Sequence, residues 1–356
     1  MTPVPITVLD LFAGAGGLTA GFREASPRYQ TVQAVEMDFA AAASYEATFG
    51  EGIVYAGPIQ DWLSEGRAPR EVDVILGGPP CQGFSTLGRQ DVQDERNALW
   101  EHYAETIATV QPKYFVVENV AAFAKSPQFE AFSNAIGIGA LSDYRFEHRI
   151  LNAADYGAAQ VRKRAVMIGH RKDVRVPGFP DPTHRGRWVT VADALSNVPT
   201  ETAGVDLPLS RRFEFKGRSY AGSFRPEELH LSRSYSKLSL DRFEHIPRGG
   251  NRFDIPYELL APCWQKHHSG SADVMGRLHW DKPSVTIRTE FFKPEKGRYL
   301  HPVANRALTH YEAALLQGFP LSHRFVGSKT AIARQIGNAV PIPLAKAIAT
   351  HLESLF

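Results

Sequence analysis

The chain has 356 residues, 43% of them hydrophobic, which is enough to build the core of one large domain with an appendage or of two domains. Its net charge of +2 is too small to indicate nucleic-acid binding. It has neither an eighteen-residue apolar run nor a signal-peptide pattern, so we expect a soluble, cytoplasmic protein with no membrane contact.

The cysteine pattern argues against a disulfide framework and against a metal site. Cys81 and Cys263 lie far apart in the chain, and the chain has no export signal. The adjacent His267 and His268 lie near Cys263, but no further cysteine completes a zinc pattern. We therefore expect no bound metal.

The N-terminal segment has the pattern of a nucleotide-cofactor site. Residues 6–12 form a predicted buried strand, and the glycine-rich turn 13–18 leads into a predicted helix, so backbone amides can approach an anionic group. A second predicted strand ends in Glu36, whose carboxylate can accept hydrogen bonds from ribose hydroxyls. S-adenosylmethionine fits this pattern better than NAD because the third glycine of the dinucleotide motif is missing at Thr19. A purely structural glycine turn is the alternative.

A candidate nucleophile follows another buried strand. The apolar run 72–76 predicts a strand of a parallel sheet, and Cys81 comes just past its carboxyl end, where ligands bind in open α/β sheets. Two glycines and two prolines precede the thiol and predict a stiff loop, which suits a nucleophile. The alternative is a small buried hydrophobic side chain in a turn.

The next segments place polar groups near the same edge of the sheet. The polar residues 83–93 predict a mobile lid or a disordered connector, and the helix that follows, ending near Val110, has Leu99 on its core face. The strand 113–120 carries Glu118 near its carboxyl end, where it is either a proton donor beside the thiol or a helix-capping residue.

A basic element precedes a further strand. In extended geometry Gln160, Arg162 and Arg164 share one face, which suits binding of a phosphate or a base carbonyl. A basic strand edge that opposes aggregation is the alternative interpretation.

The character of the chain changes after the proline-rich break 177–182. Residues 183–299 lack the alternation of strands and helices and carry 19 Lys and Arg against 14 Asp and Glu, a weak indication of a polyanion-binding domain. The C-terminal residues then return to helices, the last with an apolar stripe that includes Leu344 and Leu355. The whole pattern predicts an α/β fold with a doubly wound, mostly parallel sheet and a smaller irregular domain.

The loop Pro79-Pro80-Cys81-Gln82 resembles the catalytic loop of the DNA (cytosine-5) methyltransferases, and matching segments run from Asp10 to Pro341. The resemblance, to the bacterial restriction-modification type, implies a Rossmann-like catalytic and cofactor-binding domain of residues 1–182 and 300–356 and a target-recognition domain of residues 183–299. It also implies S-adenosylmethionine as cofactor, S-adenosylhomocysteine as product and double-stranded DNA as partner. A cognate restriction endonuclease encoded nearby is a further candidate partner, and we expect a monomer.

The resemblance implies roles for individual residues. The catalytic set is Cys81, which attacks cytosine C6, Glu118 at N3, Arg164 at the cytosine carbonyl, and Arg162, which supports the loop or a phosphate. The implied cofactor-binding residues are Phe12, Gly14, Gly16, Gly17, Glu36, Met37, Ile59, Asp61, Pro79, Leu99, Asn338 and Val340. The implied DNA-binding residues are Gln82, Ser85, Arg248, Asn251 and Arg252.

Three questions stay open at this point. Where the family commonly has an acidic residue that contacts adenine, this chain has Pro58, so either Asp61 replaces it or Ile59 packs on the purine. A catalytically silent DNA-binding module is disfavoured because Cys81, Glu118 and Arg164 are all present. A tRNA methyltransferase is disfavoured by the long basic segment in the middle of the chain.

Overall fold

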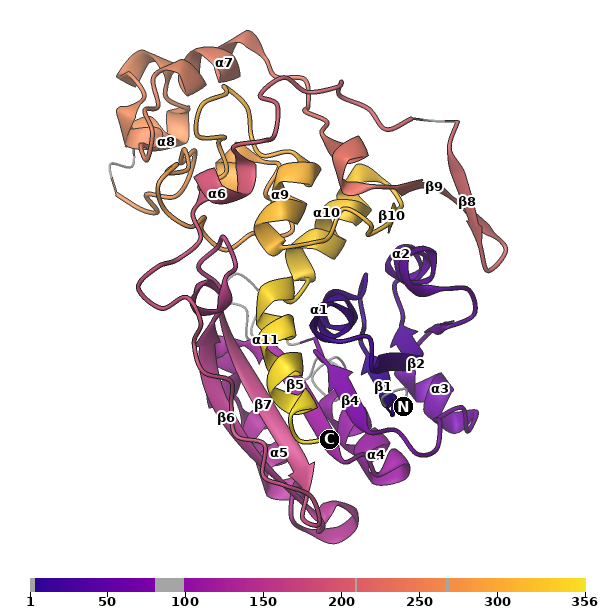
Figure 1. The fold of residues 1–356 in the computed structure, drawn as a ribbon. Coiled ribbons are helices and arrows are strands. Elements are labelled where there is room, and N and C mark those ends of the chain that lie inside the picture. The colour runs from indigo at the N-terminus through magenta and orange to yellow at the C-terminus, as the bar shows by residue number, and fades with distance from the viewer. Residues whose placement is uncertain (1–3, 81–98, 209, 267–268) are drawn as a thin grey trace.

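The computed structural model describes residues 4–80, 99–208, 210–266 and 269–356. At its centre is a seven-stranded sheet with the order β3-β2-β1-β4-β5-β7-β6 (Figure 1). Its strands are β1 (Ile6–Leu11), β2 (Tyr29–Glu36), β3 (Val54–Ala56), β4 (Val74–Gly77), β5 (Tyr114–Val120), β6 (Tyr144–Asn152) and β7 (Lys163–Arg171). β1 to β5 are parallel, and β7 is antiparallel to both of its neighbours. The expected α/β fold with a doubly wound, mostly parallel sheet is confirmed.

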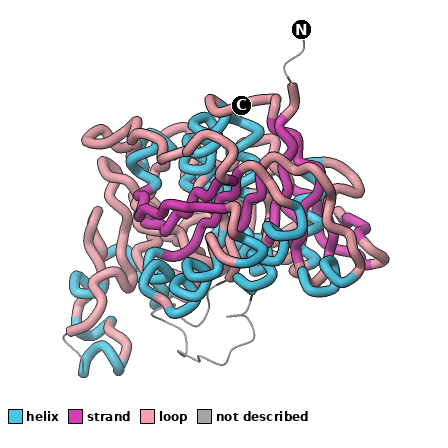
Figure 2. The backbone as a smooth tube through the Cα atoms, turned by 90° about the horizontal axis from the view of Figure 1, so that it is seen from below, coloured by secondary structure: helices cyan, strands magenta, loops and turns pink. Residues whose placement is uncertain are grey.

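Helices cover both faces of this sheet, and the view from below shows the strands between them (Figure 2). The helices of this part are α1 (Gly17–Ala25), α2 (Phe39–Phe49), α3 (Ile59–Ser64), α4 (Leu99–Val110), α5 (Pro127–Ala135) and α11 (Ile342–Glu353). Successive strand residues point to opposite faces, so Leu76 packs with α1 and α11 whereas Ile75 packs with α3 and α4. Burial on both faces explains why the strands read as continuous apolar runs.

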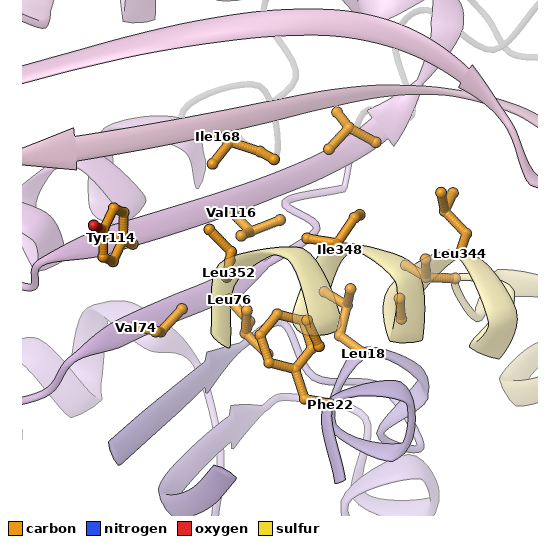
Figure 3. Packing of buried hydrophobic residues seen from close by; sticks show 14 of the residues in the cluster. Leu18, Phe22, Val74, Leu76, Tyr114, Val116, Ile168, Leu344, Ile348 and Leu352 are labelled. Atoms are coloured by element: carbon orange, nitrogen blue, oxygen red, sulfur yellow. The ribbon is translucent and has the colours of Figure 1, made fainter. Parts of the chain in front are cut away.

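The last helix closes one of these faces. Leu344, Ile348 and Leu352 of α11 are fully buried, and Figure 3 shows them lying against Leu18 and Val116. The predicted apolar stripe is confirmed for these three residues. Each such side chain contributes about 1.5–3 kcal/mol of burial free energy, so α11 holds α1, and with it the glycine-rich turn, against the sheet.

The rest of the chain forms the upper part of Figure 1. Its elements are α6 (Val191–Leu195), β8 (Arg212–Phe215), β9 (Arg218–Phe224), α7 (Lys237–Glu244), α8 (Pro262–Lys266), α9 (His310–Gln317), β10 (Phe325–Val326) and α10 (Lys329–Asn338). The short 3₁₀ helices of this part are η6 (Pro226–Leu229), η7 (Arg252–Asp254), η8 (Tyr257–Leu259) and η9 (Pro294–Lys296). Three others, η3 (Ala121–Lys125), η4 (Gly139–Leu141) and η5 (Ala153–Tyr156), lie between β5 and β7 in the part with the large sheet. None of the helices in the described ranges is long and apolar enough to span a bilayer.

Packing crosses the division expected at residue 300. Val191 and Phe224 share one hydrophobic cluster with Leu316 and Ile332, and β9 pairs with β10 in a small antiparallel sheet. The middle segment therefore packs with α9 and α10, and α11 is the helix that returns to the large sheet. The assignment of target recognition to residues 183–299 stays a prediction.

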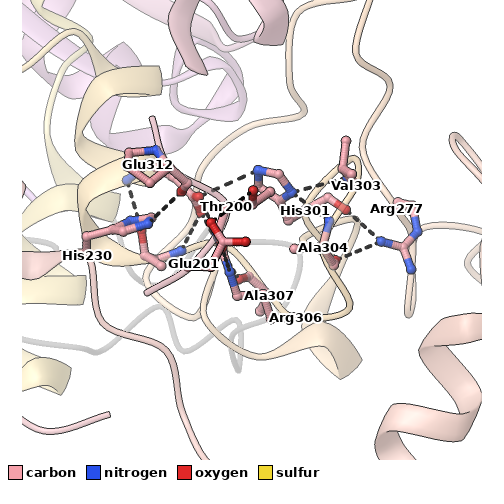
Figure 4. Close-up of polar contacts among 12 residues, drawn as sticks. Thr200, Glu201, His230, Arg277, His301, Val303, Ala304, Arg306, Ala307 and Glu312 are labelled. Atoms are coloured by element: carbon pink, nitrogen blue, oxygen red, sulfur yellow. Dashed lines mark hydrogen bonds and ion pairs between the residues drawn. The ribbon is translucent and has the colours of Figure 1, made fainter. Parts of the chain in front are cut away.

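A buried ion pair fixes this junction (Figure 4). Both guanidinium Nη atoms of Arg306 donate to the carboxylate of Glu312, at 2.8 and 2.7 Å, and Nη2 also donates to Thr200 O at 3.0 Å. Burial alone would raise the pKa of Glu312, but the hydrogen bonds and charge of Arg306 hold that pKa below its ordinary value. Such a bidentate pair, once buried, costs several kcal/mol to break, so it holds the Arg306 guanidinium in place within the C-terminal segment. The bond from this guanidinium to Thr200 O joins that segment to the middle one.

Candidate active site

The glycine-rich turn after β1 is organised around the carboxylate of Glu36. The amide of Gly14 donates to Oε2 at 2.8 Å, and the amide of Asp38 donates to Oε1 at 2.6 Å. Burial raises the pKa of Glu36, and these backbone hydrogen bonds partly oppose that shift. A Cβ placed on Gly14 would meet no atom within 4 Å, so the turn borders open space beside Glu36. A ligand can approach the backbone there, as a nucleoside cofactor requires.

Two further predicted cofactor residues make close contacts within the fold. Gly16 has a φ of 87°, and a Cβ on it would overlap the Phe49 ring. A Cβ on Gly17 would lie 3.1 Å from the carbonyl oxygen of Val340, which is itself in the predicted C-terminal cofactor element. The structure therefore brings the first and last predicted cofactor elements together at the start of α1. Asn338, at the end of α10, is exposed.

The remaining predicted cofactor residues differ in accessibility. Met37 is 65% exposed and follows Glu36 directly, whereas Ile59, the first residue of α3, is 3% exposed and packs in the core. Asp61 is exposed in the first turn of α3. Phe12 is half-buried with a φ of 55°, in the left-handed region. Which residue contacts adenine stays a prediction.

A residue that the sequence analysis missed lies beneath the glycine-rich turn. Asp10, at the end of β1, is 1% exposed and accepts a 2.7 Å hydrogen bond from Thr19 Oγ1. The Thr19 hydroxyl in turn lies 2.7 Å from Tyr45 Oη on α2. Burial raises the pKa of Asp10 to about 7. The acidic residue inside an apolar strand was the available signal, because such residues are rarely buried without a role.

The segment that leads to the predicted nucleophile passes against Glu118. Cys81, Gln82, Ser85 and the predicted lid lie outside the described residues. A Cβ on Gly78 would lie 3.4 Å from Glu118 Oε2.

Pro79 is buried, and its carbonyl accepts a 2.9 Å hydrogen bond from Asn119 Nδ2. The sequence analysis did not identify Asn119, although a carboxamide beside Glu118 at a strand end was a usable signal. Leu99, a predicted cofactor residue, is buried in the core face of α4 as expected.

Glu118 and Arg164 form an ion pair at the edge of the sheet. The distance from Arg164 Nε to Glu118 Oε1 is 2.6 Å, and the side chains are 13% and 10% exposed. Oε1 accepts no aligned hydrogen bond within the described residues, so the contact is ionic in character. β7 runs antiparallel to β5, and this register sets the first residues of β7 beside the last residues of β5. The sequence-predicted acid and arginine are therefore neighbours.

Arg162, two residues earlier, points into the protein. It is 3% exposed, and its Nη1 and Nη2 donate to the carbonyl oxygens of Ile287 and Gly337 at 2.6 and 2.9 Å. Burial, followed by the charge of Arg164, lowers the pKa of Arg162 to about 9, so the group stays charged at neutral pH. Its predicted support of the catalytic loop or of a phosphate stays a prediction.

The predicted DNA-binding residues of the middle segment do not form one exposed group. Arg248 is exposed, but the Asn251 side-chain oxygen accepts the Phe253 amide in a cap of η7. Arg252 is 6% exposed and donates to Ser269 O at 2.6 Å, with its guanidinium over the Phe253 ring. The guanidinium of Arg252 is therefore engaged within the protein in this structure, and its contact with DNA stays a prediction.

Comparison with known proteins identifies the family. Residues 6–354 match the model of the C-5 cytosine-specific DNA methylase family. The chain belongs to this family. The expected enzyme class, DNA (cytosine-5-)-methyltransferase, is confirmed by this match, as is the expected family resemblance.

Individual relatives cover nearly the whole chain. The Type II methyltransferase M1.HphI of Haemophilus parahaemolyticus is 35% identical over 97% of this chain and 86% of its own. The Type II methyltransferase M.XorII of Xanthomonas oryzae is 33% identical over 96% of this chain and 82% of its own. A crystal structure described as a prophage-encoded DNA modification methyltransferase from E. coli superposes with a TM-score of 0.71 at 26% identity, covering 98% of this chain and 99% of that one.

Proposed function

We propose that this methylase transfers a methyl group from S-adenosylmethionine to C5 of one cytosine in a short, specific sequence of duplex DNA. S-adenosylhomocysteine is the second product. The observation that carries the proposal is the ion pair of Glu118 and Arg164, which lies against Gly78 on the segment leading to Cys81. Activation of cytosine requires a thiol, an acid and a cation, and the acid and the cation lie at one sheet edge beside the segment that leads to Cys81.

The proposed chemistry begins at C6, because C5 of cytosine is a poor nucleophile. The thiolate of Cys81 adds to C6 while Glu118 donates a proton to N3, which leaves an enamine with electron density on C5. S-adenosylmethionine supplies an electrophilic methyl group, which C5 takes. Loss of the C5 proton to a base, elimination of the Cys81 thiolate and return of the N3 proton to Glu118 then restore the aromatic ring and the free enzyme.

Arg164 has two proposed roles in this scheme. It holds the cytosine carbonyl oxygen and stabilises charge that develops on the ring. Its ion pair with Glu118 also orients the carboxyl group toward the base. Because Glu118 must hold a proton to donate it, binding of the base between the two groups has to weaken this pair.

The residues around the glycine-rich turn fit an adenosine cofactor. Glu36 would accept hydrogen bonds from the ribose hydroxyls, and the amides of Gly14 and Asp38 already hold its carboxylate in position. Open space beside Gly14 allows the ligand to approach the backbone, and Val340 would close the site from the C-terminal element. Asp61 is the more accessible candidate for the adenine contact, since Ile59 is already covered by protein side chains.

Access to C6 requires a flipped base. In duplex DNA the C6 atom is stacked and out of reach of a thiol, so the cytosine must leave the helix. We assign duplex binding and base reading to residues 183–299, with Arg248 as an exposed candidate contact. Transplanting residues 183–299 into a relative should transfer the methylated sequence, and a chimaera that keeps the host sequence would contradict this assignment.

The relatives named Type II methyltransferases support a proposal for the biological setting. We propose that the protein acts as a monomer in the cytoplasm and protects host DNA from a restriction endonuclease encoded nearby. Incubation with labelled S-adenosylmethionine tests the activity: label should enter duplex DNA and not tRNA. Label in tRNA alone, or in neither, would contradict the proposal, and bisulfite sequencing of the labelled DNA would identify the target.

A further inference from the structure

Three segments that are distant in the sequence cross beside the candidate active site. The segment 159–161 pairs with the segment 284–286. The Val161 amide donates to Ser284 O at 2.8 Å, and the Ser284 amide donates to Ala159 O at 2.9 Å. The third segment is the end of α10, where a Cβ on Gly337 would overlap the backbone of Thr289. We call these residues, 159–162, 284–289 and 336–339, the crossing.

Arg162 spans two of the three segments with one guanidinium. Nη1 donates to Ile287 O at 2.6 Å and Nη2 donates to Gly337 O at 2.9 Å. No carboxylate pairs with this buried cation within the described residues, so carbonyl dipoles provide the compensation. Hydrogen bonds from a charged donor are worth about 1.5–3 kcal/mol each, and leaving such carbonyls unpaired in the interior is costly. Arg162 therefore fixes the position of Gly337 relative to the sheet.

Two glutamines extend this arrangement toward Val340. Gln160 is fully buried, accepts the Ile287 amide at 3.1 Å and donates to Gln317 Oε1 at 2.7 Å. Gln317, also fully buried, donates to Ile336 O at 2.5 Å and to Ala339 O at 3.5 Å. The carbonyls of 336, 337 and 339 are thus all held by side chains of the crossing or of α9. These residues directly precede Val340, which contacts Gly17 at the start of α1.

We propose that Arg162 is a positioning residue for the cofactor: it holds the turn 337–340 against the N-terminus of α1, so that the cofactor site is preformed. The inference rests on the proposed function, because it requires that this turn borders the S-adenosylmethionine site. It differs from the role implied by the family resemblance, in which Arg162 supports the catalytic loop or a phosphate. Its neighbour Arg164 holds the cytosine base, whereas Arg162 positions the turn that borders the cofactor.

Calorimetry with S-adenosylhomocysteine, in the absence of DNA, tests the proposal on the full-length protein. Arg162→Lys keeps the charge but cannot span both carbonyls, so we expect its Kd to rise about tenfold. With labelled S-adenosylmethionine and duplex DNA, KM for the cofactor should rise while kcat at saturating cofactor changes little. A residue that acts on the catalytic loop or a phosphate would lower kcat instead.

Arg277 provides the matched control for a purely structural role. It is 4% exposed, and its guanidinium also donates to backbone carbonyls, among them Ile246 O at 2.7 Å and His301 O at 2.8 Å, away from the turn 337–340. Arg277→Lys should lower the Tm to a similar extent as Arg162→Lys does, and it should leave the Kd for S-adenosylhomocysteine unchanged. If Arg162→Lys does not fold, Gln160→Met, which preserves side-chain volume, should show the same rise in Kd.

The outcomes separate this inference from the proposed function. A wild-type Kd in the Arg162→Lys or Gln160→Met variant, with the Tm lowered, would overturn the positioning role alone. Failure of the wild-type protein to bind either S-adenosyl compound would overturn the proposed function and this inference with it.

Discussion

Glu118 Oε1 lies 2.6 Å from Arg164 Nε, and the two side chains come from antiparallel neighbours, β5 and β7. In the proposed reaction Glu118 donates a proton to N3 of the cytosine, and a carboxyl group that carries this proton does not keep the same ion pair with Arg164. The pair is therefore a resting arrangement that the cytosine ring has to rearrange. Both residues should contribute to turnover more than to DNA or cofactor affinity.

Substitution of either partner should lower turnover. Glu118→Gln keeps the shape but cannot donate a proton to N3, and we expect kcat to fall by about 10²–10⁴. Arg164→Ala removes charge stabilisation and should cost about 10²–10³ in kcat. Labelled methyl transfer to duplex DNA measures both. An unchanged kcat in Glu118→Gln would remove this residue from the mechanism.

Asn119 should control the placement of the catalytic loop. Its Nδ2 donates to Pro79 O at 2.9 Å, two residues before Cys81. Asn119→Ala should leave this buried carbonyl unpaired, lower kcat by about tenfold or more through misplacement of the thiol, and leave cofactor affinity intact. Kinetics paired with calorimetry would check this. A variant with wild-type kcat would mean that the loop is positioned by other contacts.

Glu36 should dominate cofactor affinity. Glu36→Ala removes the acceptor for the ribose hydroxyls and also releases the Gly14 amide, so S-adenosylmethionine binding should weaken by about 1–3 kcal/mol. Asp61→Ala tests the adenine contact in the same calorimetric assay. Wild-type affinity in the Asp61 variant would leave packing by Ile59 as the account of adenine binding.

Sequence patterns indicated where side chains lie when the signals were local, and they missed contacts between residues that are distant in the chain. Glu118 and Glu36 could be predicted to lie at one edge because each stands at or near the carboxyl end of an apolar strand, and these ends collect at one edge of a parallel sheet. The burial of Arg252 was not predictable, because arginine is usually exposed and its partner, Ser269 O, lies in a loop that no pattern connects to it. The same reason hid the contacts of Arg162, whose acceptors lie more than a hundred residues away.

The expected domain boundary shows a related limit. Composition changes after Pro182, which is why the middle domain is predicted to start at residue 183, and this boundary stays a prediction. Packing depends instead on which apolar faces meet, and Phe224 meets Ile332 across the expected boundary at residue 300. Composition does not carry that information.

His323 predicts a pH dependence of stability. It is fully buried among Phe49, Phe319 and Phe325, and neither ring nitrogen has a hydrogen-bond partner within the described residues. Burial lowers its pKa to about 3. The unfolded chain, with a histidine pKa near 6.5, therefore takes up a proton that the folded protein does not, and stability is lost as the pH falls from about 6.5 toward 3.

Replacing this histidine should remove that contribution. His323→Phe should have about wild-type stability at pH 7, because no hydrogen bond is lost. At pH 5 the free energy of unfolding of this variant should exceed that of the wild type by about 2 kcal/mol. Urea unfolding of both proteins at the two pH values measures the difference. If the two proteins differ in unfolding free energy by the same amount at pH 5 and at pH 7, His323 is not held neutral in the fold.

The central claim is that Cys81 attacks cytosine C6 before methyl transfer, and trapping of the intermediate tests it most directly. Duplex DNA with 5-fluorocytosine in place of cytosine should be methylated but not released, because fluorine does not leave as the C5 proton does. We predict a covalent adduct of protein and DNA that survives denaturing gels in the wild type and in Cys263→Ser, and that is absent in Cys81→Ser although this variant still binds duplex DNA. An adduct in folded Cys81→Ser, or its loss in folded Cys263→Ser, would contradict the account.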